Sequence, residues 1–305
     1  MASPALSLTQ PRPSLIHSEA AAAWLLSAPA IIAFALMVMI PTLAAIVFAF
    51  TDYELGSRVI RFIGWANFVE LFEDRGFVAS IRNTAFFVAV VTPVSLIGGL
   101  LIAMLIEAGT RGRAFFRAVY FLPVVSLMVA MATAFQYMYH PTIGPVNALL
   151  RQIGVAGPSW LGSSDWVMIS LSIVGVWEQI GFNMVLFLAG LTAIPREIYA
   201  AAEVDGVRSP WARFWMVTWP LLGPTTLFVL TITMIRSLRV FDIVATLTQG
   251  GPNKASEVLL YTMYTEGFTF FRLGYSAAIT LVFLIIVLVL MLVQTRILDK
   301  RVHYG

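Results

Sequence analysis

Long apolar runs separated by shorter polar segments form the main pattern of the chain. A helix needs about 20 consecutive, mostly apolar residues to cross a bilayer. Six runs reach roughly that length, at residues 22–50, 84–106, 118–139, 166–194, 221–248 and 274–295. The pattern predicts an all-α integral membrane protein with six transmembrane helices and with both termini on the same side of the membrane. Residues 21–305 would form a single transmembrane domain behind a polar tail at residues 1–20.

The first two apolar runs carry further signals. A charged residue, Arg12, precedes the run at 22–50, as in a signal peptide. The apolar part of a signal peptide spans only about 7–15 residues, so we expect the much longer run to be retained as the first span. In the second run, Gly98 and Gly99 are small enough to let neighbouring helices approach closely, and we predict a packing role for them.

The polar interruption at residues 195–220 has helical signals on both sides of an Asp205-Gly206 turn. Ser209 followed by Pro210 is a helix start, since serine caps a helix and proline tolerates the first turn. The segment predicts a short helix, a bend and a second short helix. One interpretation is an amphipathic segment on the lipid surface. We favour a docking element for a soluble partner, because a simple connection between spans needs no such structure.

Arginine and lysine positions predict the orientation. Cytoplasmic loops carry an excess of these residues, most reliably when the loops are short. With the N-terminus inside, ten of them lie on the cytoplasmic side and seven outside, and the short loop 107–117 alone holds three arginines. Residues 195–220 are therefore expected to face the cytoplasm.

Composition excludes several classes of function. Of the 305 residues, 59% are hydrophobic and 11% charged, which is typical of membrane proteins. The net charge of +3 is scattered and offers no basic face for nucleic acid. The chain has no cysteine, and His17, His140 and His303 lack metal-ligand spacing. No nucleotide-binding loop or catalytic motif occurs, so an ATP-driven process would need another chain.

Four ionisable residues fall inside the predicted spans: Glu178, Arg236, Arg239 and Asp242. Each costs about 3 kcal/mol or more at mid-bilayer if it faces lipid, so each should face the bundle interior, a cavity or a partner. One interpretation is ion pairing, with Arg239 and Asp242 at i, i+3 on one helix face and Glu178 neutralising Arg236. The other is a solute site, in which Arg236 donates to hydroxyl, phosphate or sulfonate oxygens and slightly favours an anionic solute.

The helical turn around Glu178 adds amide and aromatic groups. Glu178 and Phe182 share a helix face at i, i+4, as do Gln179 and Asn183. Sugars bind through such mixtures, because their hydroxyls bond amides and carboxylates while the apolar face of the ring contacts an aromatic side chain. Core packing explains Phe182 alone equally well.

Residues 195–220 resemble the EAA loop of the permease subunits of bacterial ABC importers, through the spacing Ala201-Ala202-x-x-Asp205-Gly206, then Phe214, then Trp219-Pro220-Leu221. Further runs similar to carbohydrate-type permeases follow one another in order over about residues 24–303, at 64–68, 113–123, 144–150 and 250–252. One departure is Ala200, where the family usually has glutamate that forms a salt bridge with the ATPase. Glu203, one turn later, is a candidate substitute.

The resemblance implies a type I ABC importer permease fold and a transport subunit of the bacterial inner membrane, not an enzyme. It implies alternating-access import of a sugar or sugar-related solute, such as an oligosaccharide, a polyol, a glycerol phosphate, or an anionic or sulfonated sugar derivative. The implied partners are a second homologous permease subunit, two copies of an ATP-binding subunit that hold ATP and Mg²⁺, and an extracytoplasmic solute-binding protein. The implied substrate-binding residues are Glu178, Gln179, Phe182, Asn183, Arg236, Arg239 and Asp242. The residues implied for ATPase coupling are Ala201, Ala202, Glu203, Asp205, Gly206, Phe214 and Pro220.

A self-sufficient secondary transporter or channel is the main alternative, with the span charges acting as an ion or proton relay. Such a protein predicts inverted repeats and broken half-helices, and the sequence shows neither. It also leaves the helical loop at 195–220 without a role. A membrane-embedded enzyme is the third alternative, and the missing catalytic motifs disfavour it.

Overall fold

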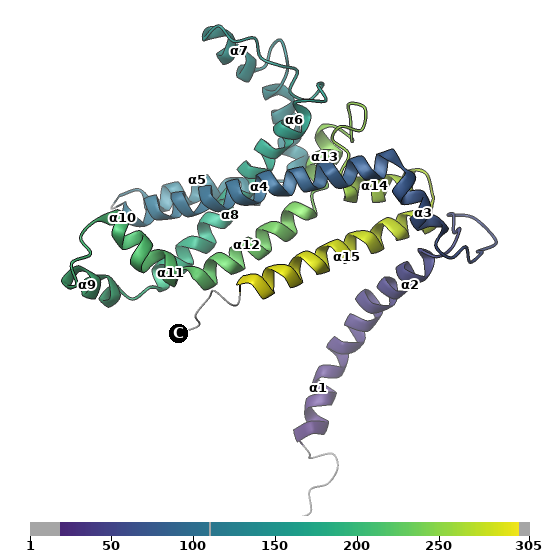
Figure 1. Ribbon diagram of the computed structural model, residues 1–305, viewed down its shortest axis with the longest axis horizontal. Helices are drawn as coiled ribbons and strands as arrows, with labels where there is room; N and C mark the ends of the chain where they lie inside the picture. Colours follow the sequence, from purple (N-terminus) through teal and green to yellow (C-terminus); the bar gives the residue numbers. More distant parts are fainter. Residues whose placement is uncertain (1–18, 110, 299–305) are drawn as a thin grey trace, which may run out of the picture.

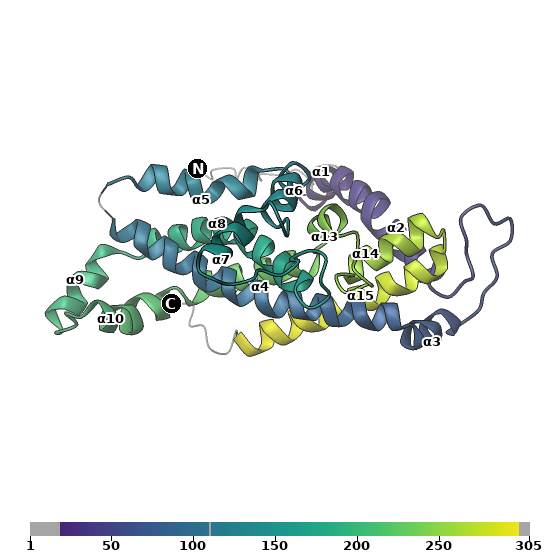
Figure 2. The ribbon, with the colours of Figure 1, turned by 90° about the horizontal axis from the view of Figure 1, so that it is seen from above.

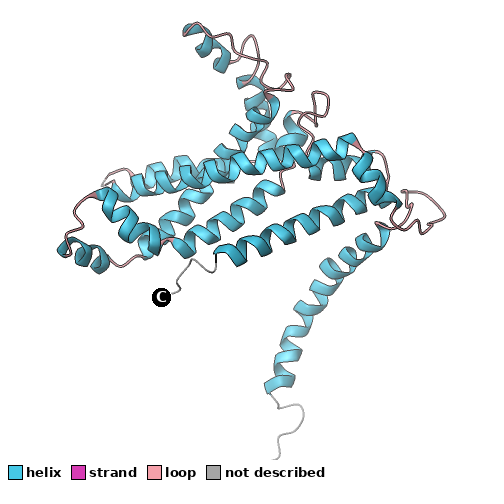
Figure 3. Ribbon diagram, in the orientation of Figure 1, coloured by secondary structure: helices cyan, strands magenta, loops and turns pink. Residues whose placement is uncertain are grey.

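The structure is a computed structural model that describes residues 19–109 and 111–298. Residues 1–18 of the predicted tail, and residues 299–305, lie outside the described residues. The described part is helical, as predicted, and its strand-like pairing is limited to an isolated bridge between Thr51 and Phe62 (Figure 3).

The first apolar run forms one continuous helical rod, made of α1 (Glu19–Phe34), the π-helical turn η2 (Ala35–Met39) and α2 (Ile40–Phe48). The long helices of the bundle are α4 (Arg75–Ala108), α8 (Val167–Ala193), α12 (Gly223–Leu238) and α15 (Leu273–Leu298). The shorter elements are α3 (Ala66–Glu73), α5 (Arg113–Val125), α6 (Met128–Met138), α7 (Pro145–Gln152), α9 (Arg196–Val204), α10 (Pro210–Arg213), η3 (Phe214–Thr218), α11 (Trp219–Leu221), α13 (Asp242–Leu247), α14 (Leu259–Tyr264) and η4 (Thr265–Thr269).

Within the described residues, four helices are long and apolar enough to cross a membrane: Ala21–Phe48, Arg75–Ala108, Val167–Ala193 and Leu273–Arg296. A fifth candidate is the pair α5 and α6, which is bent by 100° at its break. The uninterrupted run predicted over 221–248 is corrected by the structure, because α12 ends at Leu238 and α13 starts at Asp242. A broken helix is therefore present, although no break was apparent from the sequence. Unwound backbone at membrane depth is tolerated where it lines a cavity, and this break does so.

α4 and α8 pack against each other along the centre of the bundle (Figures 1 and 2). Glycine allows their close approach, since a Cβ on Gly99 would lie 2.6 Å from the Cβ of Asn183. A Cβ on Gly98 would lie 2.5 Å from the Cδ1 of Ile180. Small residues permit such helix crossings in membranes, so the packing role predicted for these two glycines is confirmed.

α12 and α15 run alongside this central pair, whereas α1 diverges from the bundle (Figure 1). None of the apolar window of this first span is buried within the chain. α9 and α10 lie at one end of the long axis, and α3 lies at the opposite end (Figure 2). The loop at 195–220 is thus separated from the segment around α3 by the length of the bundle.

Candidate functional site

Five of the seven predicted substrate-binding residues line one pocket of about 210 Å³, located where α8 meets the break between α12 and α13. They are Glu178, Gln179, Arg236, Arg239 and Asp242. The remaining wall is formed by Phe87, Met128, Val240, Phe241 and Ile243. α8, α12 and α13 therefore bring together charges that lie about 60 residues apart in the sequence.

Glu178 and Arg236 form an ion pair across the pocket, with 3.4 Å between Oε1 and Nη2. Both side chains are about one-third exposed. The guanidinium carbon of Arg236 also lies 4.7 Å from the ring centroid of Phe182, within the range of a cation–π contact. The ion pair corresponds to the first of the two interpretations of these charges, and the ring of Phe182 gives Arg236 a second contact.

Arg239 and Asp242 do not share a helix face, so that prediction was wrong. Arg239 is the C-cap that follows the last residue of α12, Leu238, and Asp242 begins α13 after Val240 and Phe241. The i, i+3 argument assumed a continuous helix, and the break removes it. Both side chains instead face the pocket from the two sides of the break.

Gln179 and Asn183 are buried in a polar network that joins α8 to α4 and α12. Asn183 is fully buried: its Nδ2 donates to Ser95 Oγ at 3.3 Å, and its Oδ1 accepts from Thr233 Oγ1 at 2.8 Å. Gln179 Nε2 donates to Ser237 Oγ at 3.3 Å, and its Oε1 has no hydrogen-bond partner. Asn183 does not line the pocket, whereas Gln179 does.

The pocket is balanced in charge, with two guanidinium groups and two carboxylates. It can donate hydrogen bonds from Arg236 and Arg239 and accept them at Glu178 and Asp242. Among the described residues, no three His, Asp or Glu side chains are placed to hold a metal ion. The arrangement is chemically suited to recognising hydroxyl groups.

The predicted helix, bend and second helix at 195–220 are confirmed. α9 ends at Val204, Gly206 has a φ of +90° that favours glycine, and Pro210 opens α10. The second helix continues through the π-helical turn η3 into α11. The hydroxyls of Tyr199 and Thr218 lie 3.2 Å apart and connect the two helices.

The family model of the binding-protein-dependent transport system inner membrane component matches residues 95–304. The chain belongs to this family. It is 33% identical over 283 residues, covering 92% of this chain and 96% of its relative, to the sn-glycerol-3-phosphate transport system permease protein UgpA of Agrobacterium fabrum. It is also 34% identical over 273 residues to the lactose transport system permease protein LacF of Rhizobium radiobacter, and the match covers 88% of this chain and 90% of LacF.

The fold of the permease is that of known ABC transporter structures. A bacterial alginate ABC transporter, solved in complex with an alginate pentasaccharide-bound periplasmic protein, superposes with a TM-score of 0.81. The two chains are 24% identical, and the match covers 92% of the permease and 96% of the other chain. This likeness describes the fold, which is an all-helical ABC permease fold.

The loop of the permease exposes most of the residues predicted for ATPase coupling. Ala201, Glu203, Asp205 and Gly206 are exposed at the first helix and the bend, and Pro220 is exposed on α11. Ala202 and Phe214 are half-buried. The sequence did not single out Tyr199 and Thr218, whose hydroxyl contact connects the helices, and no local pattern marks the two residues as partners.

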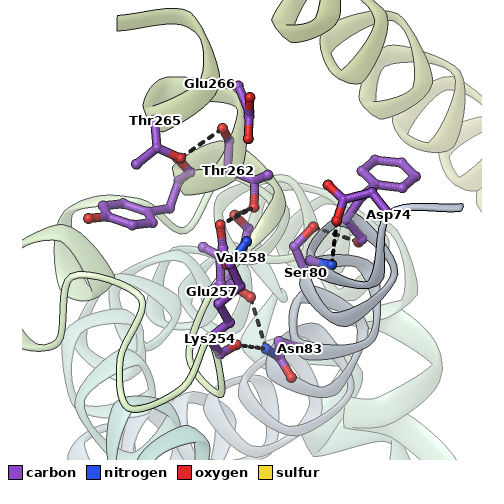
Figure 4. Close-up of polar contacts among 12 residues, drawn as sticks. Asp74, Ser80, Asn83, Lys254, Glu257, Val258, Thr262, Thr265 and Glu266 are labelled. Atoms are coloured by element: carbon purple, nitrogen blue, oxygen red, sulfur yellow. Dashed lines mark hydrogen bonds and ion pairs between the residues drawn. The ribbon is translucent and has the colours of Figure 1, made fainter. Parts of the chain in front are cut away.

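A polar cluster at the α3 end of the permease was also not predicted (Figure 4). Asn83 Nδ2 donates to the backbone oxygens of Glu257 and Lys254, at 2.9 and 3.3 Å. Burial raises the pKa of Glu266 above its usual value, and Arg272, whose Nη1 lies 3.4 Å from Glu266 Oε2, partly offsets this. The bonds from Asn83 fasten the segment after α13 to α4, and the pair of Glu266 and Arg272 connects η4 to the residue before α15.

Proposed function

We propose that this permease is one membrane subunit of an ATP-driven importer that moves a sugar or sugar-related solute across the bacterial inner membrane by alternating access. The observation that carries the proposal is the charge-balanced pocket at a helix break inside an otherwise apolar bundle. The relatives named for sn-glycerol-3-phosphate and lactose transport support this class of solute. An oligosaccharide, a polyol, a glycerol phosphate, or an anionic or sulfonated sugar derivative belongs to it.

The pocket supplies one part of the solute site. Its volume of about 210 Å³ is below the range of about 300–1,000 Å³ that is usual for ligand pockets. A second, homologous permease subunit therefore provides the opposite wall. Because Glu178 neutralises Arg236, this half of the site suits a hydroxyl-rich solute as well as an anionic one.

Within this site, the residues divide by role. Glu178, Gln179, Arg236, Arg239 and Asp242 contact the solute, and Phe182 supports Arg236. Asn183 holds the helices together beneath them, because both ends of its amide are already bonded to neighbouring helices.

Transport energy comes from two copies of a separate ATP-binding subunit, which binds ATP and Mg²⁺. The loop 195–220 meets this subunit in the cytoplasm, through Ala201, Ala202, Glu203, Asp205, Gly206, Phe214 and Pro220. The exposure of Val204 (88%) and Trp211 (70%) supports a docked partner at this end. A pair of short helices connected by a tyrosine–threonine contact transmits motion as a rigid body.

The chain crosses the membrane six times in this proposal. The crossings are α1 to α2, α4, the bent α5 and α6, α8, the broken α12 and α13, and α15. Both termini are cytoplasmic, and the segments around α3 and α14 meet an extracytoplasmic solute-binding protein.

Two experiments test the proposal. Arg236→Ala should reduce uptake by about tenfold or more, because a charge-assisted hydrogen bond contributes roughly 1.5–3 kcal/mol. Assembly and basal ATP hydrolysis should not change, and Arg82→Ala, an exposed arginine on α4, is the matched control. Unaltered uptake in Arg236→Ala would show that Arg236 has a structural role.

Purification of the intact complex should recover an ATP-binding subunit. Proton-driven uptake by this chain alone would overturn the proposal that the protein is part of an ATP-driven importer.

A further inference from the structure

A second and larger cavity, of about 640 Å³, lies at the end of the bundle where α9 and α10 are. It is open to the surface and is bounded by the last turns of α4 and α8 on one side and by α9, α10 and η3 on the other. Its volume falls in the range of ligand pockets. The solute pocket is lined by a different set of residues, so the solute does not account for this cavity.

The polar wall of the cavity is cationic. Arg196 at the start of α9 and Arg213 at the end of α10 both line it, and neither forms an ion pair with a described residue. The one carboxylate in the lining, Glu107, lies near Arg113, with 3.9 Å between Oε1 and Nη1, and its buried Oε2 has no hydrogen-bond partner. Tyr199 and Thr218 add hydroxyl groups to the same wall. Arg213 also lies over the ring of Tyr199, with 6.0 Å between its guanidinium carbon and the ring centroid. Arginines that form no ion pair can donate hydrogen bonds to phosphate oxygens, and hydroxyl groups beside them can donate as well.

The remaining wall is apolar. Met104, Leu191 and Phe214 line it, and Leu191 is buried in the core formed between α4 and α8. α4 ends at Ala108 and α8 ends at Ala193, so the cavity lies at the depth where two membrane helices stop. A ligand that fits must therefore carry an anionic head and an apolar body at the edge of the bilayer.

We propose that this cavity binds the phosphodiester head group of an anionic phospholipid from the cytoplasmic leaflet. The position in that leaflet rests on the orientation given under the proposed function. Basic pockets between membrane helices on the cytoplasmic side bind anionic head groups for the same reason. Arg196 and Arg213 hold the phosphate, and the acyl chains leave along the apolar wall. A bound lipid connects α9 and α10 to the ends of α4 and α8, and thereby holds the loop 195–220 in place.

Native mass spectrometry of the full chain, titrated with phosphatidylglycerol and separately with phosphatidylcholine, tests the site. Wild type should retain phosphatidylglycerol preferentially. Arg196→Gln combined with Arg213→Gln should weaken its retention by about tenfold or more, because charge-assisted hydrogen bonds are lost. Arg208→Gln is the matched control, since Arg208 is exposed on the same loop and does not line the cavity. Equal retention by the double variant and the control would overturn the proposal.

Two further arms keep the test decisive. If the double variant does not fold, Ala108→Phe tests the site instead. Ala108 is exposed and lines the cavity, so a phenylalanine there should fill the cavity and reduce lipid retention without removing a charge. Inorganic phosphate and sn-glycerol 3-phosphate, added as soluble competitors, should displace little lipid. If either one binds in place of phosphatidylglycerol, the cavity holds a soluble phosphate and the lipid proposal is wrong. Lipid retention requires neither an ATPase nor a solute, so this result is independent of whether the importer proposal holds.

Discussion

Replacing Asn183 with leucine separates a structural role from a solute-binding role. The sequence placed Asn183 among the solute contacts, but the structure buries it between α4, α8 and α12. Asn183→Leu removes two hydrogen bonds between helices, to Ser95 and from Thr233, and keeps a side chain of similar size.

The expected loss of stability is modest. Hydrogen bonds between membrane helices contribute about 0.6 kcal/mol on average and at most about 1.7 kcal/mol. The two partners are not left unsatisfied, because Ser95 Oγ also donates to Val91 O and Thr233 Oγ1 also donates to Val229 O, each at 2.6 Å. The total is about 1–2 kcal/mol, and each kcal/mol lowers the melting temperature by about 1–2 °C in a chain of this size.

Thermal unfolding of the purified permease and solute uptake by the assembled transporter measure the two roles. Asn183→Leu should melt lower by a few degrees and retain uptake. Gln179→Leu is the comparison, since Gln179 lies one helical turn away, bonds Ser237 and lines the pocket, so this variant should lose uptake as well. A variant of Asn183 that melts like wild type but no longer transports would refute the reasoning and restore Asn183 as a solute contact.

Three further outcomes are expected. Gly181→Ala should prevent proper folding, because its Cβ would clash with the backbone oxygen of Tyr120 on α5; normal yield and melting would contradict this. Gly206→Pro should uncouple ATP hydrolysis from uptake, since proline cannot adopt a φ near +90°, and wild-type uptake would remove the coupling role. Burial raises the pKa of Glu266 in the folded state, so its contribution to stability is present below pH 4.5 and is lost as the pH rises through the folded pKa. Glu266→Gln should flatten that part of the stability–pH curve. An unchanged curve would show that other groups cause this pH dependence.

The sequence predicted the features that depend on local pattern. Apolar runs located the long helices, and the proline and glycine positions in 195–220 located the bend, because a φ of +90° is accessible to glycine and costly for other residues. These predictions required no knowledge of how the helices pack. The pairing of Glu178 with Arg236 was one of two interpretations that the sequence left open, because opposite charges at similar depth in a membrane can either pair or face a solute, and the structure shows the ion pair.

The features that the sequence did not predict depend on tertiary contacts. Arg239, Val240 and Phe241 are compatible with a helix, so nothing local marks the break between α12 and α13. Asn183 has the chemistry of a sugar ligand, and only the neighbouring helices reveal that its amide is occupied. The role of a buried polar side chain is therefore decided by the helix opposite to it.

The break between α12 and α13 determines how the pocket is built. α12 is attached to α8 by the Glu178–Arg236 ion pair and by the hydrogen bond from Thr233 to Asn183. α13, beyond the break, packs mainly against α6. The two walls of the pocket thus have different main neighbours, although α13 also shares a buried core with α8, and residues 239–241 are the backbone that connects the walls. Under the proposed function, a solute held between Arg236 on one wall and Asp242 on the other contacts both sides of the break. A rearrangement that moves α13 relative to α12 then changes its binding free energy, which alternating access requires.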